Sequence, residues 1–148
     1  MTCDRRDFLR DALFGAGALM LPIRFVSAIA SHGTEKLYPL PTADGANIDK
    51  GESVVIARYQ NVVYAFSLAC PHQQTALRWQ ETDKEFQCPK HHSHFHADGV
   101  YIEGSGRATR GMDRFAIRRA DSNVAVDLDK LFRQDEDEAA WKAAAVQL

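Results

Sequence analysis

The sequence of 148 residues predicts an all-β fold, a small antiparallel domain with a helix on either side of it in the chain. Runs of β-branched and aromatic residues are separated by turn signals between residues 38 and 126, and no helical period interrupts them. An apolar segment precedes this part, and an alanine-rich helical pattern follows it. We therefore expect a leader over residues 1–30, a β domain over residues 31–128 and a helical tail over residues 129–148.

Three hairpins are predicted in the β domain. Residues 53–59 and 62–66 are rich in Val, Ile, Tyr and Phe, and Gln60-Asn61 between them favours a tight turn. Asp98-Gly99 is a second turn signal, directly before the short run 100–102. A third polar turn, at residues 121–123, separates two further runs that we expect to pair, 114–118 and 124–128.

The leader resembles a twin-arginine export signal. Arg5 and Arg6 precede an apolar run over residues 12–23, and Ala28-Ile29-Ala30 fits a small-x-small cleavage site. The run is shorter than the roughly 20 residues that span a bilayer, so both a cleaved signal peptide and a retained membrane anchor are compatible with it. In either case we expect the domain to lie outside the cytoplasm, on the periplasmic side of the membrane.

The tail is predicted to be helical over residues 135–146. Asp135 and Glu138 stand in a capping-box-like relation, and Trp141 and Ala145 share one face. Leu131 continues the same rhythm upstream. The helix is expected either to pack on its own β domain or to act as a docking arm for a larger complex.

Two short boxes carry the chemistry of the chain. Cys70-Pro71-His72 and Cys88-Pro89-Lys90-His91 are fifteen residues apart, and each offers one thiolate and one imidazole. Such donors hold either a tetrahedral zinc ion or a two-iron cluster with mixed ligands. Zinc sites of the finger type usually take their cysteines from one loop and their histidines from another, whereas both loops here repeat the order Cys then His. This order favours the two-iron cluster and leaves a structural zinc module as the lesser alternative.

The pattern C-x-H-x15-C-x2-H resembles the Rieske [2Fe–2S] family, in which two cysteines hold one iron and two histidines hold the other. The second box and the residues after it are similar to those of bc-complex Rieske proteins, and the likeness covers about residues 54–126. It implies one [2Fe–2S] cluster per chain. The ligands that it implies are Cys70, His72, Cys88 and His91, with the histidines on the iron that changes valence.

Four residues near the ligands are expected to tune the cluster. Thr75 and Lys90 stand where bc-type proteins carry a bracing disulfide, so this disulfide is not expected. Ser93 matches the serine that donates to a cluster sulfide in that family, whereas Phe95 replaces a tyrosine that donates to a cysteine sulfur. Because hydrogen bonds to the sulfurs raise the potential, we expect an intermediate value within the roughly −150 to +300 mV of Rieske centres.

A third loop, residues 104–107, occupies the place of the proline-rich loop that bc-type proteins carry beside the cluster. Arginines follow at Arg107, Arg110 and Arg114. They are expected to form either an ordinary solvated face or a basic patch for an anionic partner.

The resemblance implies a one-electron carrier rather than an enzyme with a complete active site of its own. No dinucleotide-binding motif and no second metal-ligand set are evident, so the chain is expected to serve as the electron-transfer subunit of an oxidoreductase. One setting is a respiratory or photosynthetic complex, either quinol:cytochrome c oxidoreductase-like or cytochrome-associated. The alternative is the small subunit of an exported molybdenum oxidase of the arsenite-oxidase type. Redox proteins are the expected partners, with quinol a candidate in the first setting, and a net charge of −2 argues against nucleic acid.

Overall fold

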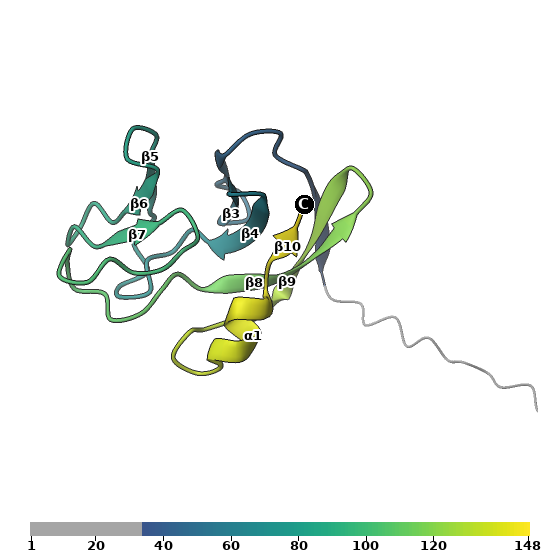
Figure 1. Cartoon of the computed structure of the whole chain (residues 1–148). Coiled ribbons are helices and arrows are strands. Elements are labelled where there is room, and N and C mark those ends of the chain that lie inside the picture. The colour runs from purple at the N-terminus through teal and green to yellow at the C-terminus, as the bar shows by residue number, and fades with distance from the viewer. Residues whose placement is uncertain (1–33) are drawn as a thin grey trace, which may run out of the picture. The chain divides into compact units, whose positions relative to one another are not determined.

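The computed structural model of the protein describes residues 34–148, so the predicted export signal lies outside the described residues (Figure 1). Strands dominate, as expected, and one short helix lies near the C-terminus. In chain order the elements are β1 (Glu35–Pro39), β2 (Gly45–Asp49), β3 (Val54–Tyr59), β4 (Val62–Ser67), β5 (Arg78–Gln80), β6 (Glu85–Gln87), β7 (His94–His96), β8 (Arg114–Ala120), β9 (Asn123–Phe132), α1 (Glu138–Ala143) and β10 (Val146–Gln147).

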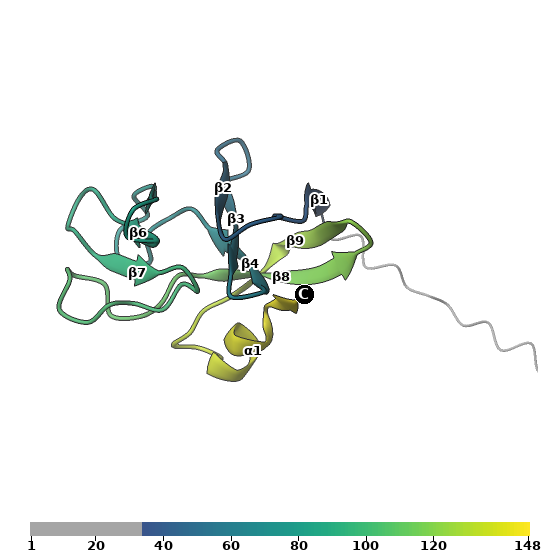
Figure 2. The ribbon, with the colours of Figure 1, turned by 45° about the horizontal axis from the view of Figure 1, so that its top comes forward.

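The strands form two antiparallel sheets. The larger has the order β1-β9-β8-β4-β3-β2, with β10 paired to β4, and the smaller has the order β5-β6-β7. The smaller sheet and its loops lie at the opposite end of the domain from β1 (Figures 1 and 2). The predicted all-β class is therefore confirmed. Within residues 34–148, no helix is long and apolar enough to cross a membrane.

The predicted hairpins are present. In the β3–β4 hairpin Tyr59 pairs with Val62, and the two turn residues Gln60 and Asn61 have φ of 50° and 63°, as a type I′ turn requires. β8 and β9 form the hairpin around residues 121 and 122. The turn after β7 uses Gly99 (φ 82°), where an added Cβ would lie 2.5 Å from the ring of Phe66.

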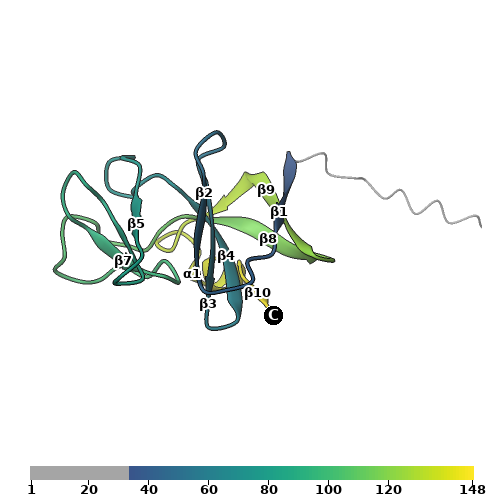
Figure 3. The same ribbon diagram turned by 90° about the horizontal axis from the view of Figure 1, so that it is seen from above.

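The two end strands of the larger sheet, β1 and β2, are linked through side chains. Asp49 of β2 accepts hydrogen bonds from Lys36 (2.9 Å) and Tyr38 (3.1 Å), both of which lie in β1 at the other end of the strand order (Figure 3). The hydrogen bond from Lys36 lowers the pKa of Asp49 to about 2. This side-chain bridge takes the place of backbone pairing between the two edges.

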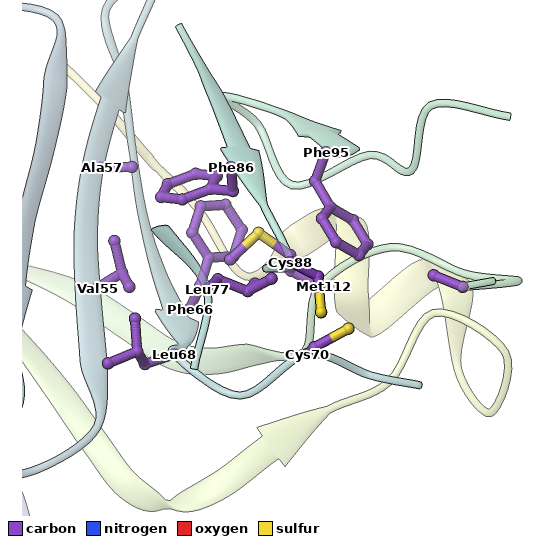
Figure 4. Packing of buried hydrophobic residues seen from close by; sticks show 11 residues of the cluster. Val55, Ala57, Phe66, Leu68, Cys70, Leu77, Phe86, Cys88, Phe95 and Met112 are labelled. Carbon is purple, nitrogen blue, oxygen red and sulfur yellow. The ribbon is translucent and has the colours of Figure 1, made fainter. Parts of the chain in front are cut away.

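The core has two parts because β3 is covered on both faces. Val54 and Ile56 pack on one side, whereas Val55 and Ala57 point to the other. The second side continues through Phe66 and the smaller sheet to the thiols of both boxes. Figure 4 shows this continuous cluster, whose buried members include Leu68, Leu77, Phe86, Phe95, Met112, Cys70 and Cys88.

The predicted helix over residues 135–146 was wrong in its bounds. The helix covers only Glu138–Ala143, and its N-cap is Asp137, whose carboxylate accepts from the amide of Ala140 (2.9 Å). After it the chain extends into β10, which pairs with β4. Upstream, β9 runs to Phe132, so Leu131 belongs to a strand rather than to the helical tail. Sheet hydrogen bonds therefore override the helical pattern at both ends of this segment.

The tail packs on its own β domain through Trp141. This indole is 2% exposed, and its Nε1 donates to the carbonyl of Met112 (2.7 Å). The guanidinium of Arg114 lies 3.6 Å from the indole centroid and donates to the carbonyls of Trp141 (2.9 Å) and Asp98 (2.6 Å). Burial lowers the pKa of Arg114 to about 10. Trp141 is thus part of the core, as expected for a helix that packs on its own β domain.

The three arginines after the third loop do not form one surface. Arg114 is buried, and Arg110 pairs with Asp113 and with Asp135. Only Arg107 is exposed. The expectation of a basic patch of three arginines was therefore wrong. Arg110 and Arg114 are held by partners within the fold, which their positions in the sequence did not indicate.

Candidate metal centre

The two boxes lie on two loops with the same backbone frame. The first loop joins β4 to β5, and the second joins β6 to β7. In each loop the cysteine amide donates to the carbonyl five residues later, and the cysteine carbonyl accepts from the amide four residues later. These distances are 2.8 and 2.8 Å in the loop of Cys70, and 2.9 and 3.0 Å in the loop of Cys88.

The frame requires a left-handed residue at the same place in both loops. Gln74 (φ 55°) and His92 (φ 56°) each lie four residues after the cysteine. Left-handed backbone is uncommon outside glycine. The two loops are therefore two copies of one turn, in which the histidine follows the cysteine by two residues in one copy and by three in the other.

The two thiols lie side by side at the edge of the buried cluster (Figure 4). Cys70 and Cys88 are both buried and unbridged, and their sulfurs are close enough to share a hydrogen bond. Burial raises the pKa of the Cys70 thiol. Burial also acts on Cys88, but the amides of His91 and Lys90 donate to its sulfur and, with Cys70, bring its pKa below the ordinary value.

The two histidines of the boxes face each other across the gap between the loops. The ring centroids of His72 and His91 are 5.0 Å apart, with the ring planes at 70°. Both Nδ1 atoms are buried and have no hydrogen-bond partner among residues 34–148. Partial desolvation lowers the pKa of His91, and the charges of Arg107 and Lys90 act in the same direction. This favours the neutral imidazole, which is the form that binds a metal.

The donor set fits a two-iron cluster. A buried nitrogen without a partner is costly unless a ligand satisfies it, and here two such nitrogens lie on the same two loops as two buried thiols. Among residues 34–148, no three His, Cys, Asp or Glu side chains converge as a single ion would require. A mixed-ligand cluster needs only two protein donors on each iron, so a thiol pair and an imidazole pair meet its requirement.

Ser93 connects the second box to the third loop. Its side chain is fully buried, and its Oγ accepts from the amides of Arg107 and Ala108, at 3.0 Å each. The hydroxyl oxygen is the acceptor in both bonds, so the hydroxyl proton remains available for donation to another group. Gly106 permits this approach, since an added Cβ would lie 2.6 Å from the carbonyl oxygen of His91.

The other positions that are expected to tune the cluster lie around the same loops. Phe95 is buried and packs on Tyr101, with ring centroids 5.7 Å apart, and the hydroxyl of Tyr101 accepts from the amide of Gly106 (3.2 Å). Thr75 closes the first loop through its carbonyl, and Lys90 is exposed. Tyr101 and Gly106 are parts of the site that the boxes did not indicate. In the sequence, the two glycines of the third loop, at positions 104 and 106, were the signal that could have indicated this part of the site.

A small antiparallel β domain that presents a thiol pair and an imidazole pair on two matching loops defines a class of protein, the [2Fe–2S] carriers with mixed cysteine and histidine ligands. The sequence model of one family, described as Rieske [2Fe-2S] domain, matches residues 40–116, which is more than half of the chain. The protein belongs to the Rieske [2Fe–2S] family. It is an electron carrier with a [2Fe–2S] cluster that works with redox partners, and the zinc alternative is wrong.

Several solved structures are similar to the chain, among them the following two. One is the plasma membrane Rieske protein PetC3 from Synechocystis, with 22% identity and a TM-score of 0.46, covering 55% of this chain and 82% of that one. The other is the ferredoxin of carbazole 1,9a-dioxygenase from Nocardioides aromaticivorans, with 20% identity and a TM-score of 0.41, covering 60% and 86%. No curated protein matches the chain.

Proposed function

We propose that the protein is an exported one-electron relay of a respiratory or photosynthetic electron-transfer complex. The observation that supports it most is the pair of buried Nδ1 atoms, without partners among residues 34–148, on the same two loops as the pair of buried thiols. The residues that we propose as cluster ligands are Cys70, His72, Cys88 and His91.

The cluster, when bound, supplies the one-electron change, and the chain controls its surroundings. Backbone amides that follow each cysteine donate to the sulfurs and stabilise their negative charge. The buried side chains of Phe86, Phe95 and Met112 exclude water from the thiol side. The rings of His72 and His91 are only half-buried, which gives a partner close access to the imidazole side.

The ligand assignment is tested by comparing two adjacent histidines. His91→Ala should abolish the visible and EPR spectra of the cluster and remove bound iron, because it deletes one of the four donors. His92→Ala is the matched control: His92 is exposed and contributes only its backbone to the loop, so the spectra should persist. A cluster that survives in the His91 variant would refute the assignment.

The export proposal rests on the leader alone. Replacing Arg5 and Arg6 by lysine should retain the cluster-loaded protein in the cytoplasm, whereas the unchanged chain should appear on the periplasmic side. Mass spectrometry of the native membrane fraction, by the presence or absence of residues before Ser31, distinguishes a retained anchor from a cleaved signal.

The second candidate is the small subunit of an exported molybdenum oxidase. It is favoured by the loops themselves, which use hydrogen bonds and carry Thr75 and Lys90 where quinol-oxidising bc-type relatives have their disulfide. Purification of the tagged protein from native membranes, followed by haem and molybdenum analysis, separates the two settings. Haem with quinol oxidation supports the first, and molybdenum supports the second.

A further inference from the structure

A groove of about 810 Å³ lies beside the two ligand loops. Its apolar floor is formed by Leu68, Leu77 and Trp79, of which Leu68 and Leu77 are otherwise almost fully buried. Trp79 lies in β5, Leu77 directly precedes this strand, and Leu68 directly follows β4. The volume is within the range of specific binding sites, roughly 300–1,000 Å³.

Two cations stand at the rim of this groove. Lys50 belongs to the turn between β2 and β3, and Arg78 begins β5; both are exposed. Neither forms an ion pair with any residue in the described part of the chain. No aspartate or glutamate lines the groove. The lining residues therefore carry a net positive charge, on a chain whose net charge is −2, while the nearby carboxylates of Asp49, Glu52 and Glu81 are paired with Lys36 and Lys84.

The groove reaches both ligand loops on the cysteine side. Thr75 lines it and accepts, through its carbonyl, from the amide of Cys70 at 2.8 Å. Pro89 also lines it and is bonded directly to Cys88. Neither His72 nor His91 lines the groove. An occupant would therefore approach the thiol pair by a face that is separate from the imidazole pair.

We propose that this groove docks an acidic redox partner protein, which places apolar side chains on the floor and carboxylates against Lys50 and Arg78. The inference rests on the proposed relay function and names the chemistry of one partner. The step is the transfer of one electron from the reduced partner to the oxidised cluster, with no bond made or broken. Positive charge at the rim matches such a partner and should accelerate its association.

The test uses the cluster-loaded protein and a reduced plant-type ferredoxin, an acidic protein whose reduction potential lies below those of Rieske centres, so that the electron moves toward the cluster. Stopped-flow absorbance gives the second-order rate at low and high ionic strength. The groove variant is Lys50→Glu with Arg78→Glu. The control is Lys130→Glu with Arg119→Glu, which makes the same change of charge at two exposed cations outside the groove. EPR spectra and reduction potentials verify that every cluster is intact.

We expect the groove variant to react about ten-fold more slowly at low salt and to lose most of its salt dependence, whereas the control stays within about two-fold of the unchanged protein. Ala76→Glu, which adds a negative charge at an exposed lining position and removes no cation, should also slow the reaction. Equal rates in the groove and control variants would overturn the proposal, as would failure of the unchanged protein to react with ferredoxin.

Two further outcomes are informative. If the groove variants change the oligomeric state in sedimentation rather than the rate, the groove holds a second copy of the chain and the proposal is overturned. If the unchanged cluster accepts no electron even from dithionite, the relay function itself fails. If dithionite reduces the cluster normally but the groove substitutions leave the rate with ferredoxin unchanged, only the docking proposal is overturned.

Discussion

Replacing Ser93 by alanine should weaken the fold and lower the reduction potential together. The hydroxyl accepts from two amides, those of Arg107 and Ala108, at 3.0 Å each. The amide of Ala108 is buried and would be left without a partner, at a cost of about 1–3 kcal/mol, whereas the part-buried amide of Arg107 can turn to water at a smaller cost. We therefore expect a loss of about 2 kcal/mol in the free energy of unfolding.

The potential should fall because the hydroxyl proton of Ser93 has no acceptor among the described residues, whereas the hydroxyl oxygen already accepts two bonds. If it donates to the cluster, as in the relatives that this loop resembles, its removal favours the oxidised state. Urea unfolding followed by circular dichroism measures the first effect, and protein-film voltammetry measures the second.

Ser105→Ala is the matched control. Ser105 also accepts an amide, that of His94 (2.8 Å), but its own proton goes to the carbonyl of Ile102 (2.6 Å). This variant should lose stability and leave the potential unchanged. An unchanged potential in the Ser93 variant would refute donation to the cluster. An unchanged stability would refute the role of the hydroxyl as acceptor for the third loop.

Three other substitutions test the supports of the site. Gly106→Ala should push the third loop away from the second box and lower both cluster occupancy and stability, as measured by visible absorbance and urea unfolding, because its Cβ would overlap the backbone of His91. Trp141→Ala should cost about 3–5 kcal/mol in urea unfolding, since a buried indole and its hydrogen bond are lost; a loss below about 1 kcal/mol would contradict the packing of the tail. Asp49 has a lowered pKa, about 2, so its bridge to Lys36 stabilises the fold above the unfolded pKa near 4 and is lost as the pH falls from there toward about 2. Asp49→Asn should therefore destabilise the protein at pH 7, and the difference in urea midpoint should shrink as the pH falls through about 2 and disappear below it.

Local turn chemistry made the hairpins predictable from the sequence. Gln60-Asn61 and Asp98-Gly99 place residues that tolerate positive φ between extended runs, and the structure has positive φ at Gln60, Asn61 and Gly99. The strand β1 lacked such a signal. Its position depends on pairing with β9, about 90 residues later, and on Asp49, which no local pattern reveals.

The site was predictable where the chain itself repeats a motif, and not where distant segments meet. The order Cys then His in each box indicated the paired donors. The burial of Arg114 was not indicated, because one of its two acceptors and the indole beside it belong to Trp141, 27 positions later, and the other acceptor is the carbonyl of Asp98, 16 positions earlier. The tail itself was expected to be helical to Val146, but pairing of Val146 with Val63 of β4 supplies hydrogen bonds that a longer helix would forgo.

The matching hydrogen-bonded frames around Cys70 and Cys88 bear on the order of events during biogenesis. A covalent brace between the loops would need an oxidant, and oxidants act on the far side of the membrane. Hydrogen bonds between amides and carbonyls need none. The two loops can therefore reach their final form in a reducing compartment, and thiol reductants should leave the finished centre undisturbed. For the exported chain that we propose, both loops could be complete before the chain crosses the membrane.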